Sequence, residues 1–347
     1  MKAVKIGNKT IGGESPCFII AEIGMNHNGD IELAKKIIDA AADCGVDAVK
    51  FQMFTAEKLV TKDAVTYGAV KGHLPKYQQE MYKKYELTKE QYLELRKYAE
   101  NLGLVFFASV WDEENADLLE AVGGQIFKTG AQDLTHLPLI EHIAKKNKPV
   151  ILSTGMSTID EIKEAVDTVR KYNDNLVILH CVSSYPAKAE DTNLRSMATL
   201  MDTFNCPVGF SDHTPDILTD VAAVAIGAKV IEKHFTIDKS LPGVDHHLSF
   251  DPAEMKAMVQ SIRAVEQMLG SREKKVVPSE EETRRMARRS LIAKVMIPKG
   301  VVITKDMIVI KRPGTGLAPK MIYKVVGKKS KADIKEDGVI DEGMIEW

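Results

Sequence analysis

The sequence predicts an α/β fold, a (β/α)₈ (TIM) barrel followed by a small β-rich domain. Eight short apolar runs alternate with segments of helical periodicity over about 255 residues, which is the usual size of such a barrel. Several of these runs are continuously apolar, as expected for parallel strands that are covered on both faces. In addition, a polar or charged residue stands at the carboxyl end of nearly every run.

The chain begins with residues 1–16, in which Val4, Ile6 and Ile11 flank the turn-competent pair Gly7-Asn8 and predict a hairpin. The eight expected barrel strands follow at 17–23, 48–52, 105–109, 125–129, 150–153, 176–180, 207–211 and 230–234.

Amphipathic segments between these runs predict helices that cover the barrel. The first has its apolar stripe over 31–41. Another begins at Ser157, which we expect to be its N-cap, and runs to Val169. Residues 217–225 predict the helix between the last two strands. The eighth helix carries a methionine-rich stripe over 255–269, which is typical of core packing.

An open, doubly wound sheet is the competing architecture. The turn after the first strand reads Gly24-Met25-Asn26-His27-Asn28-Gly29, which is not the GxGxxG pattern of a dinucleotide-binding fold. A Walker sequence is also absent from the chain. These observations favour the barrel.

The composition changes after residue 270, which we expect to end the barrel domain of residues 1–270. Residues 271–290 are dense in charge and predict a linker with an exposed helix. Residues 291–347 contain short β-like runs at 291–293, 301–303, 307–310, 325–326 and 339–340. A domain this small buries little core by itself, so we expect it to dock against something larger.

The overall composition excludes several classes of protein. With 47 basic and 49 acidic residues the net charge is −2, so no global field favours nucleic acid or anionic lipid. We find neither an apolar run of the roughly 20 residues that a membrane helix needs nor an N-terminal signal segment. The four cysteines are scattered, which predicts free thiols in a reducing cytoplasm.

Two histidines follow neighbouring strands of the predicted barrel. His213 comes after the run Pro207-Val208-Gly209-Phe210, and His234 comes after Val230-Ile231. Parallel neighbours would bring both imidazoles to the same rim of the barrel. Such a pair, with coordination positions left open, is typical of an exchangeable catalytic divalent metal.

The other expected strand ends carry residues that bind anions. Lys50 and Lys128 offer ammonium groups, and Ser109, Ser153 and Ser211 offer hydroxyls. In a barrel, reactive groups lie at the carboxyl ends of the strands. The set therefore predicts a phosphorylated or carboxylated substrate beside the metal.

Each of these residues also has an ordinary explanation. A serine after a strand is often a helix N-cap, and a lone histidine is more often a hydrogen-bonded core residue than a ligand. A lysine at such a strand end could instead form a Schiff base with a carbonyl substrate. The convergence of many polar groups at one rim is what favours a catalytic site.

Several motifs in this order resemble the sialic acid synthase family, over essentially the whole chain. The motifs are Ala21-Glu22-Ile23-Gly24-Met25-Asn26-His27-Asn28-Gly29, Val49-Lys50-Phe51-Gln52, Leu152-Ser153-Thr154-Gly155-Met156, Leu179-His180-Cys181, Ser184-Tyr185-Pro186, Gly209-Phe210-Ser211-Asp212-His213, Ile231-Glu232-Lys233-His234-Phe235 and Lys311-Arg312-Pro313-Gly314. The C-terminal region is similar to the antifreeze-like (SAF) domain of these enzymes.

The resemblance implies a metal-dependent condensation of phosphoenolpyruvate with an N-acetylated amino sugar such as N-acetylmannosamine, using Mn²⁺ or Mg²⁺. It assigns the metal to His213 and His234 and proton handling and sugar orientation to Glu22. It assigns Lys50, Ser109, Lys128, Ser153, Ser183, Ser211 and, more loosely, Arg284 to phosphoenolpyruvate, and Gln52, Tyr185, Asp245 and Arg312 to the sugar. The family's equivalent of Arg312 reaches a neighbouring subunit, which implies a domain-swapped homodimer.

The sequence departs from the family pattern at three positions. Ala131 stands where a serine is usual, Ser183 replaces a common asparagine, and Trp111 adds bulk after Ser109. The segment Pro242-Gly243-Val244-Asp245-His246 looks more like the neuraminate and legionaminate branch than the pseudaminate branch. Legionaminate or pseudaminate synthesis, with a diacetamido-dideoxy hexose as acceptor, remains the alternative within the family.

Two alternatives come from other functional classes. A Schiff-base pyruvate aldolase would use Lys50 or Lys128 and would be indifferent to chelators. A non-enzymatic carbohydrate- or ice-binding protein would be consistent with the C-terminal region. Such a scaffold has no need of two rim lysines beside a histidine pair, so we expect an enzyme.

Overall fold

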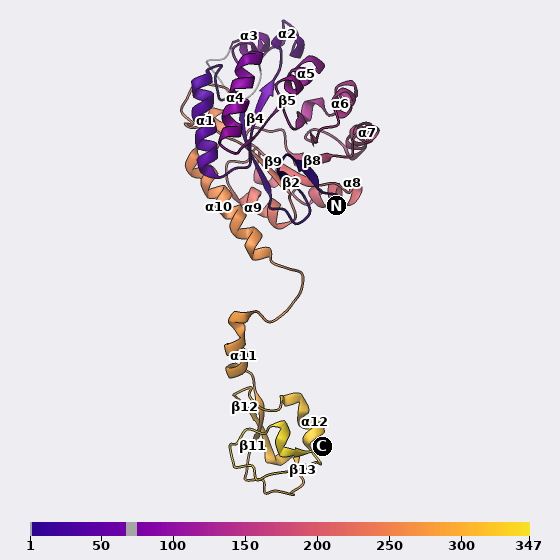
Figure 1. The fold of residues 1–347 in the computed structure, drawn as a ribbon, viewed down its shortest axis with the longest axis vertical. Coiled ribbons are helices and arrows are strands. Elements are labelled where there is room, and N and C mark those ends of the chain that lie inside the picture. Colours follow the sequence, from indigo (N-terminus) through magenta and orange to yellow (C-terminus); the bar gives the residue numbers. More distant parts are fainter. Residues whose placement is uncertain (1, 67–74) are drawn as a thin grey trace. The chain divides into compact units, whose positions relative to one another are not determined.

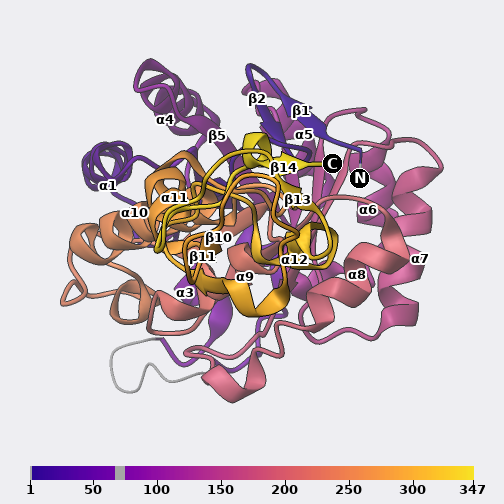
Figure 2. The ribbon, with the colours of Figure 1, turned by 90° about the horizontal axis from the view of Figure 1, so that it is seen from below.

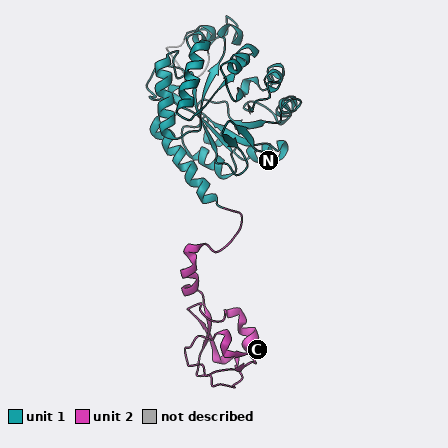
Figure 3. Ribbon diagram, in the orientation of Figure 1, with its two compact units in different colours: residues 1–270 teal, residues 271–347 magenta. Residues whose placement is uncertain are grey.

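The computed structural model describes residues 2–66 and 75–347. The chain divides into two compact units, Met1–Gly270 and Ser271–Trp347, each of which is described by itself (Figure 3).

The first unit is a closed barrel of parallel strands with helices outside it, which confirms the predicted fold class (Figure 1). Each strand pairs with its sequence neighbour, and β10 closes the barrel against β3. The strands are β3 (Phe18–Gly24), β4 (Ala48–Met53), β5 (Val105–Val110), β6 (Phe127–Thr129), β7 (Val150–Ser153), β8 (Leu176–Cys181), β9 (Val208–Asp212) and β10 (Val230–His234). The expected ranges and these strands differ by at most two residues at either end.

Strand alternation sorts the side chains into two cores. Alternate residues face the barrel interior, where Phe18, Ile20, Phe107, Leu179 and their neighbours form one apolar cluster. The predicted hairpin, β1 (Val4–Ile6) and β2 (Lys9–Ile11), adds its apolar side chains to this interior cluster. The same alternation decides which residues at the other ends of the strands can face a ligand.

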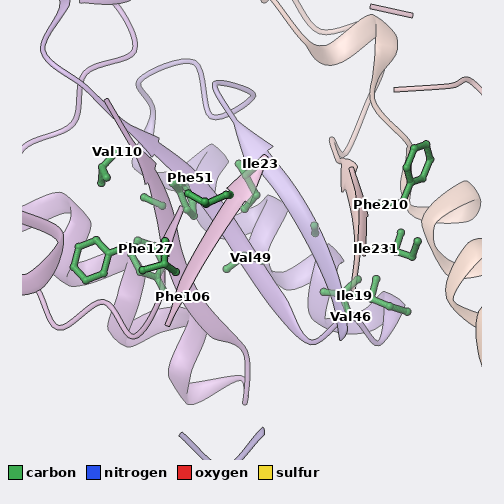
Figure 4. Packing of buried hydrophobic residues seen from close by; sticks show 14 of the residues in the cluster. Ile19, Ile23, Val46, Val49, Phe51, Phe106, Val110, Phe127, Phe210 and Ile231 are labelled. Carbon is green, nitrogen blue, oxygen red and sulfur yellow. The ribbon is translucent and has the colours of Figure 1, made fainter. Parts of the chain in front are cut away.

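The outward side chains pack against the surrounding helices and form the larger core (Figure 4). Figure 2 shows these helices at the periphery of the barrel. They are α1 (Ile31–Cys44), α4 (Lys89–Asn101), α5 (Glu113–Ala121), α6 (Leu137–Ala144), α7 (Ile159–Arg170), α8 (Ser196–Phe204), α9 (Leu218–Ala225) and α10 (Pro252–Leu269). Two short helices, α2 (Ala56–Leu59) and α3 (Gln78–Lys83), interrupt the connection between β4 and α4.

Three details of the expected helices were wrong. The N-cap of α7 is Thr158 rather than Ser157, because Thr158 forms a reciprocal capping box with Glu161. Helix α9 buries Thr219, Asp220, Ala223 and Val224, and Leu218 is 72% exposed. The methionine-rich stripe of α10 ends early, since Met268 and Leu269 are exposed.

The second unit begins with α11 (Glu281–Ala287) and continues with β11 (Ser290–Ala293), β12 (Ile308–Lys311), α12 (Ile322–Val325), β13 (Lys329–Ser330) and β14 (Ile345–Glu346). Its core includes Leu291, Ile303, Ile308 and Ile340. The β-like run at 325–326 was wrong, because Val325 ends a helix. Residues 301–303 contribute only an isolated bridge, from Val302 to Lys329.

Two further features concern membrane-spanning helices and the cysteines. Among the described residues, no helix is long and apolar enough to cross a membrane. Cys17, Cys44, Cys181 and Cys206 are all free and buried.

Candidate active site

A cavity of about 500 Å³ opens at the carboxyl ends of the barrel strands. Twelve of the residues predicted from the sequence line it together. They are Glu22, Lys50, Gln52, Ser109, Lys128, Ser153, Ser183, Tyr185, Ser211, His213, His234 and Asp245. They come from seven of the barrel strands and from the segments after β8, β9 and β10, so closure of the barrel is what brings this set together.

One half of the cavity floor is organised around Lys50. Its Nζ lies 2.5 Å from Glu22 Oε2 and donates to Ser109 Oγ at 2.8 Å. The other carboxylate oxygen of Glu22 accepts a hydrogen bond from Gln52 Nε2 at 2.9 Å. Burial raises the pKa of Glu22, although the adjacent Lys50 ammonium opposes this.

The other half is organised around Glu232, to which the sequence analysis gave no role. Its Oε1 accepts from Ser211 Oγ at 3.0 Å and lies 3.5 Å from Lys128 Nζ. Burial alone would raise the pKa of Glu232, but Lys128, Lys50 and the Ser211 hydroxyl outweigh it and lower the pKa. Burial lowers the pKa of Lys128, which Glu232 partly offsets. The two lysines are therefore held beside carboxylates before any substrate binds.

His213 and His234 lie next to one another, with ring centroids 5.6 Å apart. Tyr185 packs against both, with its ring 4.2 Å from His213 and 6.0 Å from His234. His213 Nδ1 is 2.7 Å from the carbonyl oxygen of Val182, so this nitrogen carries the proton and Nε2 keeps its lone pair. Burial lowers the pKa of both rings, and that of His234 falls well below its ordinary value.

These two imidazoles fit a divalent cation chemically. Burial favours the neutral form of both rings, and the hydrogen bond to Val182 fixes the His213 tautomer as in metal sites. His234 Nδ1 is buried and has no hydrogen-bond partner among the described residues. Those residues contain no cluster of three or more His, Cys, Asp and Glu that could hold a metal.

Asp245 borders the histidine side of the cavity. Its Oδ2 is 4.0 Å from His234 Nδ1, and burial raises its pKa to about 7 with a contribution from Glu22. Gly24, with φ of 54°, lies at the register shift of β3. A Cβ there would come within 3.6 Å of Glu22, Gln52 and Asp245 side chains, so glycine leaves the space between them open.

Four small side chains, those of Ala131, Ser153, Cys181 and Ser183, also line the cavity. Ser153 is buried, and its Oγ has no partner among the described residues. Ser183 Oγ and Cys181 Sγ approach Gly155 so closely that a Cβ there would lie within 2.8 Å of both. Ala131 lines the same cavity and contributes no hydroxyl. This region offers an anion an unused buried donor at Ser153.

Part of the cavity lining is apolar. Phe54, Met25, Met81 and Tyr85 form a buried cluster, against which Leu59, Tyr82, Trp111 and Val244 pack. Trp111 stacks on Phe54 with ring centroids 4.9 Å apart. We call Met25, Leu59, Met81, Trp111 and Val244, which line the cavity, the apolar wall.

Arg284 and Arg312 lie in the second unit and are exposed. Arg284 lines a separate open depression together with Arg285, Arg288 and Gly314, and its guanidinium is 3.9 Å from Glu281. Their predicted contacts with phosphoenolpyruvate and sugar therefore remain predictions.

The alternation of side chains along a strand explains why Glu232 lines the cavity and His180 does not. Glu232 lies two residues before His234, so both face inward, and this spacing could have identified it. His180 faces outward instead and contacts the Thr192 carbonyl oxygen at 2.7 Å. His27 and His246 are both buried, and burial lowers the pKa of each to about 4.

The fold and the cavity define a (β/α)₈ enzyme-like barrel, with a convergent polar site at its carboxyl rim, joined to a second small domain. The NeuB family model matches residues 37–274 and the SAF domain model matches residues 288–346. The chain belongs to the NeuB family, whose named relatives are sialic, legionaminic and pseudaminic acid synthases.

Individual relatives cover nearly the whole chain. N,N'-diacetyllegionaminic acid synthase of Legionella pneumophila is 46% identical over 330 residues, covering 93% of each protein. Human N-acetylneuraminate-9-phosphate synthase is 39% identical over 350 residues, covering 97% of this chain and 94% of the human protein. The crystal structure of N-acetylneuraminic acid synthetase from Leptospira borgpetersenii, in complex with citrate, matches with a TM-score of 0.75 and 35% identity over 81% of this chain and 95% of that chain.

Proposed function

We propose that this protein is a divalent-cation-dependent nonulosonic acid synthase. It condenses phosphoenolpyruvate with an unphosphorylated N-acetylmannosamine-type sugar and releases inorganic phosphate by C–O cleavage. The observation that carries the proposal is the pair of neutral imidazoles, His213 and His234, in the same cavity as the Lys50 and Lys128 ammonium groups. A cation-binding pair beside an anion-binding floor suits an anionic donor and an aldehyde acceptor.

The proposed reaction forms one carbon–carbon bond. C3 of phosphoenolpyruvate attacks the sugar aldehyde carbon, whose oxygen becomes an alkoxide and takes up a proton. Water adds to the cationic C2 and loses its proton. The resulting tetrahedral intermediate breaks its C2–O bond to the phosphate, which yields the keto acid and inorganic phosphate. A divalent cation held by the two histidines would polarise the aldehyde oxygen as a Lewis acid.

The cavity residues divide into three roles in this proposal. Lys50, Lys128, Ser109, Ser153, Ser183 and Ser211 bind the phosphate and carboxylate of phosphoenolpyruvate. Glu22 supplies the proton that the alkoxide oxygen takes up and accepts the proton that the attacking water loses, since burial raises the pKa of its carboxyl group. Gln52, Tyr185 and Asp245 contact the sugar.

The acceptor is unphosphorylated in this proposal because of the charges around the cavity. Lys50 and Lys128 are the only lysines or arginines in its described lining, and both are already paired at the floor. A terminal phosphate on the sugar would therefore find no free lysine or arginine among the described lining residues, and desolvating it there would be costly.

The apolar wall favours a second candidate acceptor within the same class. Met25, Leu59, Met81, Trp111 and Val244 offer a surface for methyl groups rather than hydroxyls. A diacetamido-trideoxy hexose, the precursor of legionaminate or pseudaminate, carries a C6 methyl and a second acetamido methyl. N-Acetylmannosamine carries one methyl group in total.

One assay tests the proposal. Phosphate release from phosphoenolpyruvate is measured with N-acetylmannosamine, its 6-phosphate and 2,4-diacetamido-2,4,6-trideoxymannose, each with and without a chelator. We expect turnover with an unphosphorylated sugar that stops on chelation. Turnover with the 6-phosphate alone would contradict the proposed acceptor class, and turnover unaffected by chelation would contradict the cation.

Two variants locate the chemistry. His213→Ala and His234→Ala should each lose turnover while the far-UV and near-UV circular dichroism stays that of the parent. His142→Ala is the matched control, since its ring lies on α6 and contacts Asp117 at 2.7 Å, away from the cavity lining. Borohydride trapping of pyruvate on Lys50 or Lys128 would instead favour the Schiff-base alternative.

A further inference from the structure

A buried ion pair lies directly behind the two histidines. Lys233 precedes His234 on β10, and Asp212 precedes His213 at the end of β9, so both side chains face away from the cavity. They occupy paired positions on the neighbouring strands, and Lys233 Nζ is 2.5 Å from Asp212 Oδ2. Lys233 is 2% exposed and Asp212 is 1% exposed.

The same two side chains hold the main chain around His213. Asp212 Oδ1 accepts from the Thr214 backbone N–H at 2.8 Å, and its Oδ2 accepts from Thr214 Oγ1 at 2.8 Å. Lys233 Nζ donates to the carbonyl oxygens of Thr214 at 2.7 Å and Asp216 at 3.3 Å. The residues before and after His213 are therefore tied to the residue before His234.

Burying the Lys233–Asp212 pair in these surroundings costs free energy. Lys233 packs over the Phe250 ring, with Nζ 4.2 Å from its centroid, and lies 3.5 Å from the buried Asp220 of α9. Removing two charges from water costs several kcal/mol per ion, and well-packed apolar residues are often as stable in such positions. What apolar residues could not supply is the directional hydrogen bonding to Thr214 and Asp216.

We propose that Lys233 and Asp212 are positioning residues that set the spacing and orientation of the His213 and His234 imidazoles for a divalent cation. They act through the main chain and touch neither the cation nor the substrate. Metal ligation depends on outer groups of this kind to orient the ligands. The inference rests on the proposed function, because it presupposes that the histidine pair binds a cation.

The test measures cation affinity rather than turnover. Full-length, chelator-treated protein is titrated with Mn²⁺, and free Mn²⁺ is followed by electron paramagnetic resonance. We expect Lys233→Met and Asp212→Asn each to weaken Mn²⁺ binding by about 10- to 100-fold. Arg263→Met is the control, because it breaks the 3.0 Å pair with Asp47 at the opposite ends of the strands and should leave the affinity unchanged.

The outcomes separate this inference from the proposed function. A folded Lys233→Met variant, or an Asp212→Asn variant if the first does not fold, that binds Mn²⁺ within twofold of the parent overturns the positioning role alone. An equal loss of Mn²⁺ affinity in Arg263→Met overturns the positioning role as well, since the effect would then reflect a general loss of stability. A parent protein that binds no Mn²⁺ overturns both the inference and the proposed cation.

Discussion

Asp133 is a buried carboxylate whose charge the fold compensates only in part. It lies in the short 3₁₀ turn after β6 and is 9% exposed, and its Oδ2 has no hydrogen-bond partner among the described residues. Burial raises its pKa from 3.8 to about 7, although Lys128 opposes this. Replacing Asp133 with asparagine removes the charge and keeps the shape, so we expect a pH-dependent gain in stability.

Proton linkage gives the sign and the size of the expected change in the free energy of unfolding. Between pH 4 and 7 the unfolded chain has lost the Asp133 proton and the folded chain keeps it, so the free energy of unfolding falls as pH rises. A pKa difference of about 3 corresponds to about 4 kcal/mol, which is the upper limit of the effect. Asp133→Asn should match the parent near pH 4 and exceed its stability by up to about 4 kcal/mol above pH 7.

Urea denaturation of both proteins at pH 4.5, 6, 7 and 8 measures this difference. A stability difference that stays constant with pH would refute the reasoning, because only a titrating group gives a slope. Greater stability of the parent at pH 8 would refute it too. Asp174→Asn is the control: this carboxylate is 71% exposed, and its loss should change stability by no more than about 0.5 kcal/mol.

Two further substitutions test the barrel scaffold by denaturation. Thr158→Ala should cost about 1 kcal/mol by removing the N-cap of α7, whereas Ser157→Ala, at the residue expected from the sequence, should cost much less. Gly209→Ala should cost about 1–3 kcal/mol, because its Cβ would come within 2.7 Å of Val230 and Leu179 atoms on both neighbouring strands. A neutral Gly209→Ala would show that β9 can move aside.

The barrel was predictable because each strand is bounded by local signals. The short apolar run 150–152 fits a strand covered on both faces, and the strand lies at 150–153 in the structure, as expected. Helix α9 was harder, because Asp220 is buried by an ion pair with Lys233 that no periodicity reveals. A helix oriented by its apolar stripe alone is rotated relative to α9 in the structure. In that orientation Leu218, which is exposed, would face the core.

The site residues that the sequence could predict are those whose side-chain direction follows from their position on a strand. Lys50, Lys128 and His234 lie at inward-facing positions of their strands, and the structure places all three in one cavity. The apolar wall could not be foreseen, because Met81 comes from an excursion between β4 and α4 whose path the sequence pattern does not determine. Long-range packing, rather than local propensity, shapes that part of the site.

Charge balance links the floor of the cavity to the histidine pair. Lys50 is paired with Glu22 and Lys128 with Glu232, so the four buried charges already cancel. Phosphoenolpyruvate adds a phosphate and a carboxylate. Each lysine can bind these groups only while it also stays next to its carboxylate partner. Protonated imidazoles could not offset that charge, because burial keeps the pKa of His213 and His234 low. A divalent cation on those two rings would offset that charge, which links the proposed donor to the proposed cation.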